Sequence, residues 1–340
     1  MLVPVMLAVV LVWLGVSVFQ PGHGKGHGRV DVAIPARSST SQIGSILSKD
    51  GVVSSGLFFR LRAVLSGRRS DLHSGHFVMA RDMSYAAAID VLAAKPVVPK
   101  VVKVTIPEGK SRHEIATIAE DDGLTGSYLT ASARSPALSP RHFGAPRATS
   151  SLEGFLFPAT YQLPGGAPAS RLVAEQLAAF KLNLSHVRLA AARRKHLTPY
   201  DVLIIASMVE REAQVARERP LIAAVIYNRL HRRIPLGIDA TTRYELNNWT
   251  RPLTNADLAR NTPYNTRRRR GLPPTPIGNP GLASIKAAAR PAGVPYLYYV
   301  VRPGSCGTHA FSSTAAQFQR DVASYNSARA RSGGRSPTRC

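Results

Sequence analysis

The chain has 340 residues, of which 44% are hydrophobic, so it is long enough to form a sizeable core and two or three domains. A net charge of +24 is typical of proteins with a polyanionic partner, such as nucleic acid, anionic lipid or an acidic wall polymer. No RNA-recognition motif or Cys/His finger is present, and two cysteines, Cys306 and Cys340, are too few for a disulfide framework or a metal site. We therefore expect no nucleic-acid partner, no metal and no cofactor.

Residues 2–19 are an uncharged apolar run interrupted only by a proline, a glycine and a serine. As a helix with a rise of about 1.5 Å per residue, this run just spans a bilayer core of about 30 Å. We therefore expect a transmembrane anchor at residues 1–20, followed by a flexible linker at residues 21–37. A cleaved signal peptide is the alternative, but the basic leader and the small-residue cleavage site typical of one are missing.

An internal repeat occupies residues 39–132, and its second copy begins 72 residues after the first. Each copy has a leading serine (Ser39 or Ser111), isoleucines three residues apart, an Asp-Gly pair and a second serine. This pattern predicts a capped helix, a glycine stop and a second short helix. A β-branched strand at residues 101–107 precedes the second copy, whereas the first copy has no clear strand before it. The pattern resembles the carbohydrate-binding LysM module, so we assign a LysM-like region to residues 38–148; a packing domain without a ligand is the alternative.

Residues 134–150 are typical of a linker or surface loop, since they are rich in proline, serine and arginine. The next segment, residues 152–161, places Glu153 among several aromatic residues. Aromatic faces beside a carboxylate suit a sugar subsite, but they suit core packing equally well.

Two carboxylates, Glu210 and Glu212, close an apolar helical run that begins with Thr198 as the expected N-cap and Pro199 as the first helical residue. Apolar residues three, four and seven positions before Glu212 place it on an apolar stripe. Burial and the negative end of the helix dipole would raise the pKa of such a carboxyl, as a general acid requires. A solvated pair or a salt bridge is the alternative interpretation.

Several polar segments follow this helix. Asp239 and Thr241 lie in a turn before another helix, and Tyr264 and Asn265 lie in a polar loop. The run of arginines at residues 267–270 is interpreted as a solvated basic face, with an anion contact as the alternative.

The remaining C-terminal segments are a loop, a hairpin and a tail. Residues 271–281 contain too many prolines and glycines for a helix or strand, and a stiff loop of this length is commonly functional. Residues 296–301 and 308–312 predict a hairpin. Its His309 is interpreted as a hydrogen-bonded structural histidine, with a second acid or base as the alternative. We expect residues 328–340 to be a disordered basic tail.

In this order, the segments resemble the endolytic murein transglycosylases, the MltG or YceG-like family. The matching segments are residues 152–155, 206–213, 225–230, 239–241, 264–266, 271–277, 287–291, 296–300 and 309–311. The resemblance implies an α+β protein: an N-terminal transmembrane helix, LysM-like modules and a mixed α/β catalytic domain at residues 149–327 that carries a glutamate on a helix. It also implies anchoring in the cell membrane with the catalytic domain outside the cytoplasm.

The implied activity is a lyase that cuts peptidoglycan glycan strands internally, between N-acetylmuramic acid and N-acetylglucosamine, leaving 1,6-anhydro ends. The family's catalytic residue is a glutamate of the Glu-X-Glu segment. We favour Glu212, because Glu212-Ala resembles the ends of catalytic helices in other lytic transglycosylases, and Glu210 is the alternative. Substrate-orienting roles are assigned to Glu153, Asp239, Thr241, Tyr264 and Asn265. Peptidoglycan strands and cell-wall synthases are the implied partners.

Three other functions are compatible with parts of the sequence. A hydrolytic muramidase would need Glu153 or Asp239 as a second catalytic carboxylate, because hydrolytic glycosidases use a pair. A non-enzymatic LysM-type wall-binding protein would need the repeat alone. A basic nucleic-acid binder would have strongly salt-dependent affinity, and the apolar N-terminal run argues against it.

Overall fold

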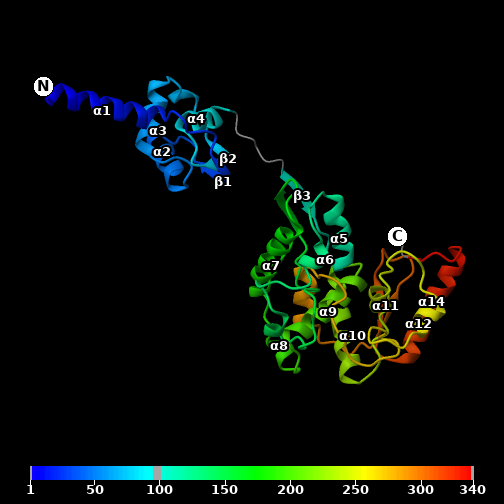
Figure 1. Cartoon of the computed structure of the whole chain (residues 1–340). Coiled ribbons are helices and arrows are strands. Elements are labelled where there is room, and N and C mark those ends of the chain that lie inside the picture. The colour runs from blue at the N-terminus through cyan, green and yellow to red at the C-terminus, as the bar shows by residue number, and fades with distance from the viewer. Residues whose placement is uncertain (1, 95–100, 338–340) are drawn as a thin grey trace. The chain divides into compact units, whose positions relative to one another are not determined.

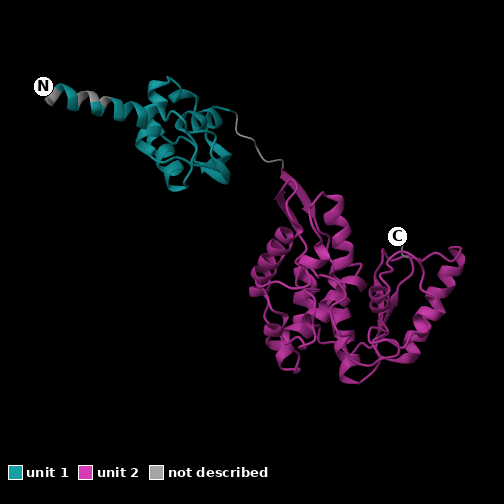
Figure 2. Cartoon of the chain, viewed as in Figure 1, with its two compact units in different colours: residues 1–100 teal, residues 101–340 magenta. Residues whose placement is uncertain are grey.

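The computed structural model describes residues 2–94 and 101–337. The chain divides into two compact units, residues 1–100 and residues 101–340 (Figure 2). This division lies inside residues 38–148, which the sequence analysis assigned as one LysM-like region with an internal repeat. The two copies of the repeat therefore belong to different units, and each copy is completed by chain outside the repeat.

Unit 1 is a small α+β unit in which two strands pair antiparallel and helices complete the core (Figure 1). After the N-terminal helix its elements are β1 (His27–Ile34), α2 (Thr40–Lys49), α3 (Gly56–Leu65), a 3-10 turn (Arg69–Asp71), β2 (Gly75–Arg81) and α4 (Tyr85–Ala93). Strand β1 corrects two expectations, because it precedes the first copy of the repeat and occupies part of the expected linker. Val32 and Ile34 alternate with exposed residues and face the core. This alternation is too short to predict a strand from the sequence, because the segment before it is rich in glycine.

The N-terminal helix α1 (Leu2–Phe19) belongs to unit 1 and contacts its helix α3. Trp13 lies edge-on to Phe58 with ring centroids 6.0 Å apart. Gln20 accepts a hydrogen bond from the backbone N–H of Tyr85 at 2.9 Å. Within the described residues, we find no helix with the length and apolarity that crossing a membrane requires. The transmembrane anchor at residues 1–20 stays a prediction.

Both copies of the repeat have the same local structure, as the pattern predicts. Ser39 begins α2 and Ser111 begins α5 (Arg112–Asp121), each through a capping box with the residue three positions on. Both helices stop at an Asp-Gly pair in which the glycine takes a positive φ, +71° at Gly51 and +75° at Gly123. Each copy is flanked by two strands that pair antiparallel, so strand, helix, helix, strand is the shared arrangement.

Unit 2 is mainly helical, with two separate antiparallel strand pairs, which makes the whole chain α+β. Its elements are β3 (Val101–Thr105), α5, α6 (Tyr128–Ala131), a 3-10 turn (Pro140–Phe143), β4 (Thr160–Pro164), α7 (Ala169–Ser185), α8 (Ala190–Arg193), α9 (Pro199–Glu212), a 3-10 turn (Ala216–Glu218), α10 (Arg219–His231), α11 (Asp239–Glu245), α12 (Asn255–Ala259), α13 (Leu282–Ala289), β5 (Tyr298–Val301), β6 (His309–Ser312) and α14 (Ala315–Arg331).

The predicted hairpin is confirmed, since β5 pairs antiparallel with β6 and Tyr299 lies opposite Phe311. The prediction that a disordered tail begins at residue 328 is wrong, because helix α14 continues to Arg331 and Ala328 is buried. Cys306 is disulfide-bonded, and the other cysteine, Cys340, lies outside the described residues.

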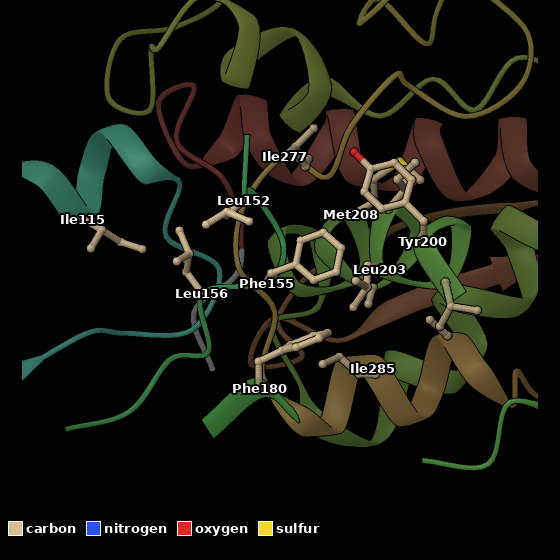
Figure 3. Packing of buried hydrophobic residues seen from close by; sticks show 14 of the residues in the cluster. Ile115, Leu152, Phe155, Leu156, Phe180, Tyr200, Leu203, Met208, Ile277 and Ile285 are labelled. Atoms are coloured by element: carbon tan, nitrogen blue, oxygen red, sulfur yellow. The ribbon is translucent and has the colours of Figure 1, made fainter. Parts of the chain in front are cut away.

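Helix α9 runs through the core of unit 2 and fixes the position of its C-terminal end. It begins as predicted, with Thr198 in a capping box and Pro199 at the first helical position. Residues 202–209 are all buried, and Figure 3 shows Leu203 beside Phe155 and Tyr200, whose rings stack 6.0 Å apart. Each large apolar side chain buried here stabilises the fold by about 1.5–3 kcal/mol. The last residues of α9 are therefore held on a rigid frame.

Candidate active site

Glu210 is a buried ion-pair residue that joins three elements at the end of α9. Its side chain is 5% exposed, and Arg219 Nη2 donates to its Oε1 at 3.1 Å. The backbone N–H of Gly281, the N-cap residue of α13, donates to Oε2 at 2.8 Å. Arg219 also donates through Nε to Ser284 Oγ at 3.0 Å. Both oxygens of Glu210 are thus occupied by the fold itself, which is a structural arrangement.

Glu212 has a different environment, although it is only two residues away. It is half-buried, and the hydroxyl of Tyr299 donates to its Oε2 at 3.0 Å. The other oxygen, Oε1, has no hydrogen-bond partner among the described residues and keeps some surface accessible to solvent. One oxygen is held in place and the other is open to a ligand.

Burial raises the pKa of Glu212, and the nearby negative charge of Asp239 raises it further. The Tyr299 hydrogen bond, the neighbouring His309 and the Arg267 guanidinium lower the pKa of Glu212, but it stays above its ordinary value. We call these five residues, Glu212, Asp239, Arg267, Tyr299 and His309, the Glu212 cluster.

Asp239 and Arg267 form one side of the Glu212 cluster. Asp239 is the first residue of α11, and Arg267 Nε donates to its Oδ1 at 2.6 Å. Both side chains are partly exposed, so this ion pair faces solvent near the acid rather than the core. The cluster therefore carries a fixed pair of opposite charges beside a carboxyl with a raised pKa.

His309 is a hydrogen-bonded structural histidine, as predicted. It is buried on β6, its backbone N–H donates to Glu218 Oε1 at 3.0 Å, and its Nδ1 lies 2.7 Å from Glu218 Oε2. The imidazole meets the ring of Tyr299 edge-on, with centroids 5.3 Å apart. Glu218 thus fixes His309, and His309 packs against the tyrosine that bonds Glu212.

Comparison with known proteins identifies the group to which this arrangement belongs. The model of the YceG-like family matches residues 32–324. The chain belongs to the YceG-like family.

Two relatives with curated names and one solved structure extend this result. An endolytic murein transglycosylase of Streptococcus pneumoniae R6 is 32% identical over 298 residues, which are 80% of this chain and 54% of the relative. The chain thus spans about half the length of that relative. An endolytic murein transglycosylase of Bacillus subtilis 168 is 29% identical over 329 residues, 93% of this chain and 90% of the relative. The crystal structure of a YceG-like protein of Listeria monocytogenes has a TM-score of 0.57 at 27% identity, covering 86% of this chain and 99% of that one.

In this YceG-like protein, Glu153 lies in the interior and not at an open site. It is 1% exposed, and it accepts hydrogen bonds from the backbone N–H of Arg112, the hydroxyl of Tyr244 and Nδ2 of Asn279. Burial raises its pKa to about 7, against the lowering effect of these donors. Glu153 therefore joins α5, α11 and the loop at residues 271–281, and a substrate cannot reach it without displacing them.

Three other residues assigned to substrate binding also have partners within the fold. Thr241 is buried and donates to the carbonyl of Ile238 at 2.7 Å, and buried Asn265 donates to the carbonyl of Leu258 at 2.8 Å. Half-buried Tyr264 shares a hydrogen bond of 2.8 Å with Thr275. Of the five assigned residues, Asp239 is the one that joins the Glu212 cluster.

Sequence reasoning missed two residues of this region. Tyr299 was expected as a strand residue only, and Glu218 lies between two arginines, a pattern typical of a solvated face. Arg267 belongs to the run interpreted mainly as solvated. The strand alternation of β5 does mark Tyr299, because it faces opposite to Tyr298. Within the part of the chain that the structure describes, no three His, Cys, Asp or Glu residues gather as metal ligands.

Proposed function

We propose that the protein is an endolytic murein transglycosylase in which Glu212 acts first as acid and then as base. The observation that carries this proposal is the asymmetry of the two glutamates. Both carboxylate oxygens of Glu210 accept hydrogen bonds, from Arg219 and from the N–H of Gly281. Glu212 instead has a raised pKa and one oxygen open to solvent. Both curated relatives described above carry the name endolytic murein transglycosylase.

The mechanism follows from which oxygen of Glu212 is open. Tyr299 donates to Oε2, so the proton of the neutral acid sits on Oε1, the oxygen that solvent reaches. This proton passes to the glycosidic oxygen as the N-acetylglucosamine leaving group departs from C1 of N-acetylmuramic acid. The resulting carboxylate then takes the proton of the C6 hydroxyl while that oxygen bonds to C1. The intramolecular hydroxyl replaces water at high effective concentration, which gives the 1,6-anhydro end.

A hydrolytic muramidase fits this geometry less well. Hydrolytic glycosidases need a second free carboxylate to act as nucleophile or to activate water. Glu153 is enclosed by hydrogen bonds, and Asp239 is paired with Arg267 at 2.6 Å. A single-carboxyl reaction requires neither of them.

The cellular setting belongs to the same proposal. The apolar α1 would anchor the protein in the cell membrane, with the catalytic unit outside the cytoplasm. The two strand-helix-helix-strand segments would act as LysM-like glycan-binding modules, and cell-wall synthases would be partners because they supply nascent strands. The net charge of +24 supports residence beside an acidic wall and lipid surface.

Mass spectrometry of products from purified glycan tests the activity. We expect internal cleavage with anhydro-muramoyl ends for the wild type and loss of these ends for Glu212→Gln. Products with reducing ends would indicate a hydrolase, and the absence of any cleavage by the wild type would indicate a wall-binding protein.

A further inference from the structure

The run of four arginines at residues 267–270 borders a hollow that the mechanism above does not use. The hollow has a volume of about 280 Å³. It is lined by Pro263, Thr266, Arg269, Arg270, Gly271, Leu272 and Pro274. Its wall is therefore part cationic and part aliphatic.

The arginines of this hollow are available to a ligand. Arg267 is paired with Asp239, but among the described residues Arg269 and Arg270 have neither an ion pair nor a side-chain hydrogen bond, and both are exposed. The loop that carries them is fixed from within, because the side chain of Asn265 donates to two backbone carbonyls and accepts from the N–H of Arg267 at 3.1 Å. The backbone that carries these two arginines is thus fixed, and no described acidic side chain pairs with their charges.

A short series of contacts connects the hollow to the Glu212 cluster. Thr266 lines the hollow, and its hydroxyl accepts from the backbone N–H of Ile238 at 3.0 Å, immediately before α11. The next residue, Asp239, pairs with Arg267, which acts electrostatically on Glu212. The hollow is thus connected to the acid through Thr266, Asp239 and Arg267.

We propose that this hollow binds a carboxylate of the peptide that N-acetylmuramic acid carries, at the sugar next to the bond being cut. The inference rests on the proposed function. Guanidinium groups match carboxylates geometrically, with two parallel hydrogen bonds. The peptide is attached to the muramoyl sugar through its lactyl group, so it starts beside the reacting bond. Its carboxylates meet Arg269 and Arg270, and its aliphatic parts pack on the prolines and Leu272.

The test compares three forms of one glycan: with its peptides, with the peptides removed by an amidase, and with the peptide carboxylates amidated. We expect wild type to show a higher kcat/KM on the first form than on the other two, by about tenfold. Arg269→Ala combined with Arg270→Ala should abolish this ratio. The matched control, Arg193→Ala with Arg194→Ala, removes the same charge from exposed arginines of α8 and its C-cap and should leave the ratio intact.

Equilibrium binding of the same three glycans separates this inference from the proposed function. Wild type could make no anhydro ends and still bind the peptide-bearing form more tightly, with the Arg269/Arg270 double variant losing that preference. This result would support the carboxylate site and contradict the enzyme assignment. The inference is overturned if the double variant keeps the wild-type preference. It is equally overturned if the amidated glycan behaves like the native one, because bulk and not charge would then be recognised.

Discussion

Exchanging each glutamate of the Glu-X-Glu segment for glutamine should separate stability from catalysis. Glu210→Gln removes the buried partner of Arg219 and a charged acceptor of the Gly281 N–H, while leaving the Glu212 cluster in place. Glu212→Gln removes the ionisable group but keeps an amide oxygen that can accept from Tyr299. The two variants differ by one atom each from wild type and lie two residues apart.

The magnitudes follow from burial. Removing one partner of a buried ion pair costs about 3–5 kcal/mol. Arg219 is 16% exposed, and Glu108 lies 3.8 Å from it as a partial replacement, so we expect about 2–3 kcal/mol. For a unit of this size each kcal/mol lowers Tm by about 2–4 °C, which gives about 4–12 °C for Glu210→Gln. Glu212→Gln should change stability by less than about 1 kcal/mol and lower kcat/KM by at least about a hundredfold.

Thermal unfolding and glycan digestion, measured on the same preparations, provide the assay. Digestion is performed well below the Tm of Glu210→Gln, so that activity is compared between folded molecules. The reasoning is refuted if Glu210→Gln is as stable as wild type yet inactive, or if Glu212→Gln retains activity. Either result would exchange the roles of the two carboxylates.

Three further changes test the electrostatics of Glu212 and Glu153, the two acids whose raised pKa values the account uses. Tyr299→Phe removes a hydrogen bond that stabilises the Glu212 carboxylate, so the alkaline limb of the pH profile of kcat/KM should move to higher pH, whereas Tyr298→Phe should leave it in place. Asp239→Asn removes a negative charge that raises the pKa of Glu212, so the same limb should move to lower pH. Folded Glu153 keeps its proton to about pH 7 but unfolded Glu153 loses it near 4.5, so stability should fall by up to about 3 kcal/mol between these values. Chemical unfolding across this range should show a flatter profile for Glu153→Gln; equal slopes would contradict the assignment.

Local signals in the sequence were sufficient for the elements that position the site. The capping residues of α9 and of both repeat copies were predictable, because a serine or threonine side chain bonds a backbone N–H three residues on. The hairpin β5–β6 was predictable from its β-branched and aromatic residues around a turn. Strand β1 was not, since only two of its residues are buried.

Whether a polar residue has a structural role or belongs to the candidate site depends on contacts with residues that are distant in the chain. Glu153 lies among aromatic residues that suit a sugar subsite, yet Asn279, 126 positions away, encloses it. Glu210 and Glu212 have similar sequence surroundings, and the partners that distinguish them come from α10, α13 and β5. The periodicity of one segment therefore cannot predict which distant residue will contact each glutamate.

Digestion of purified glycan in water labelled with heavy oxygen tests the central claim most directly. If the C6 hydroxyl of the sugar closes on C1 after proton donation by Glu212, the new ends carry the anhydro mass and contain no oxygen from the solvent. New ends that incorporate the label would show that water is the nucleophile and would contradict the single-carboxyl mechanism.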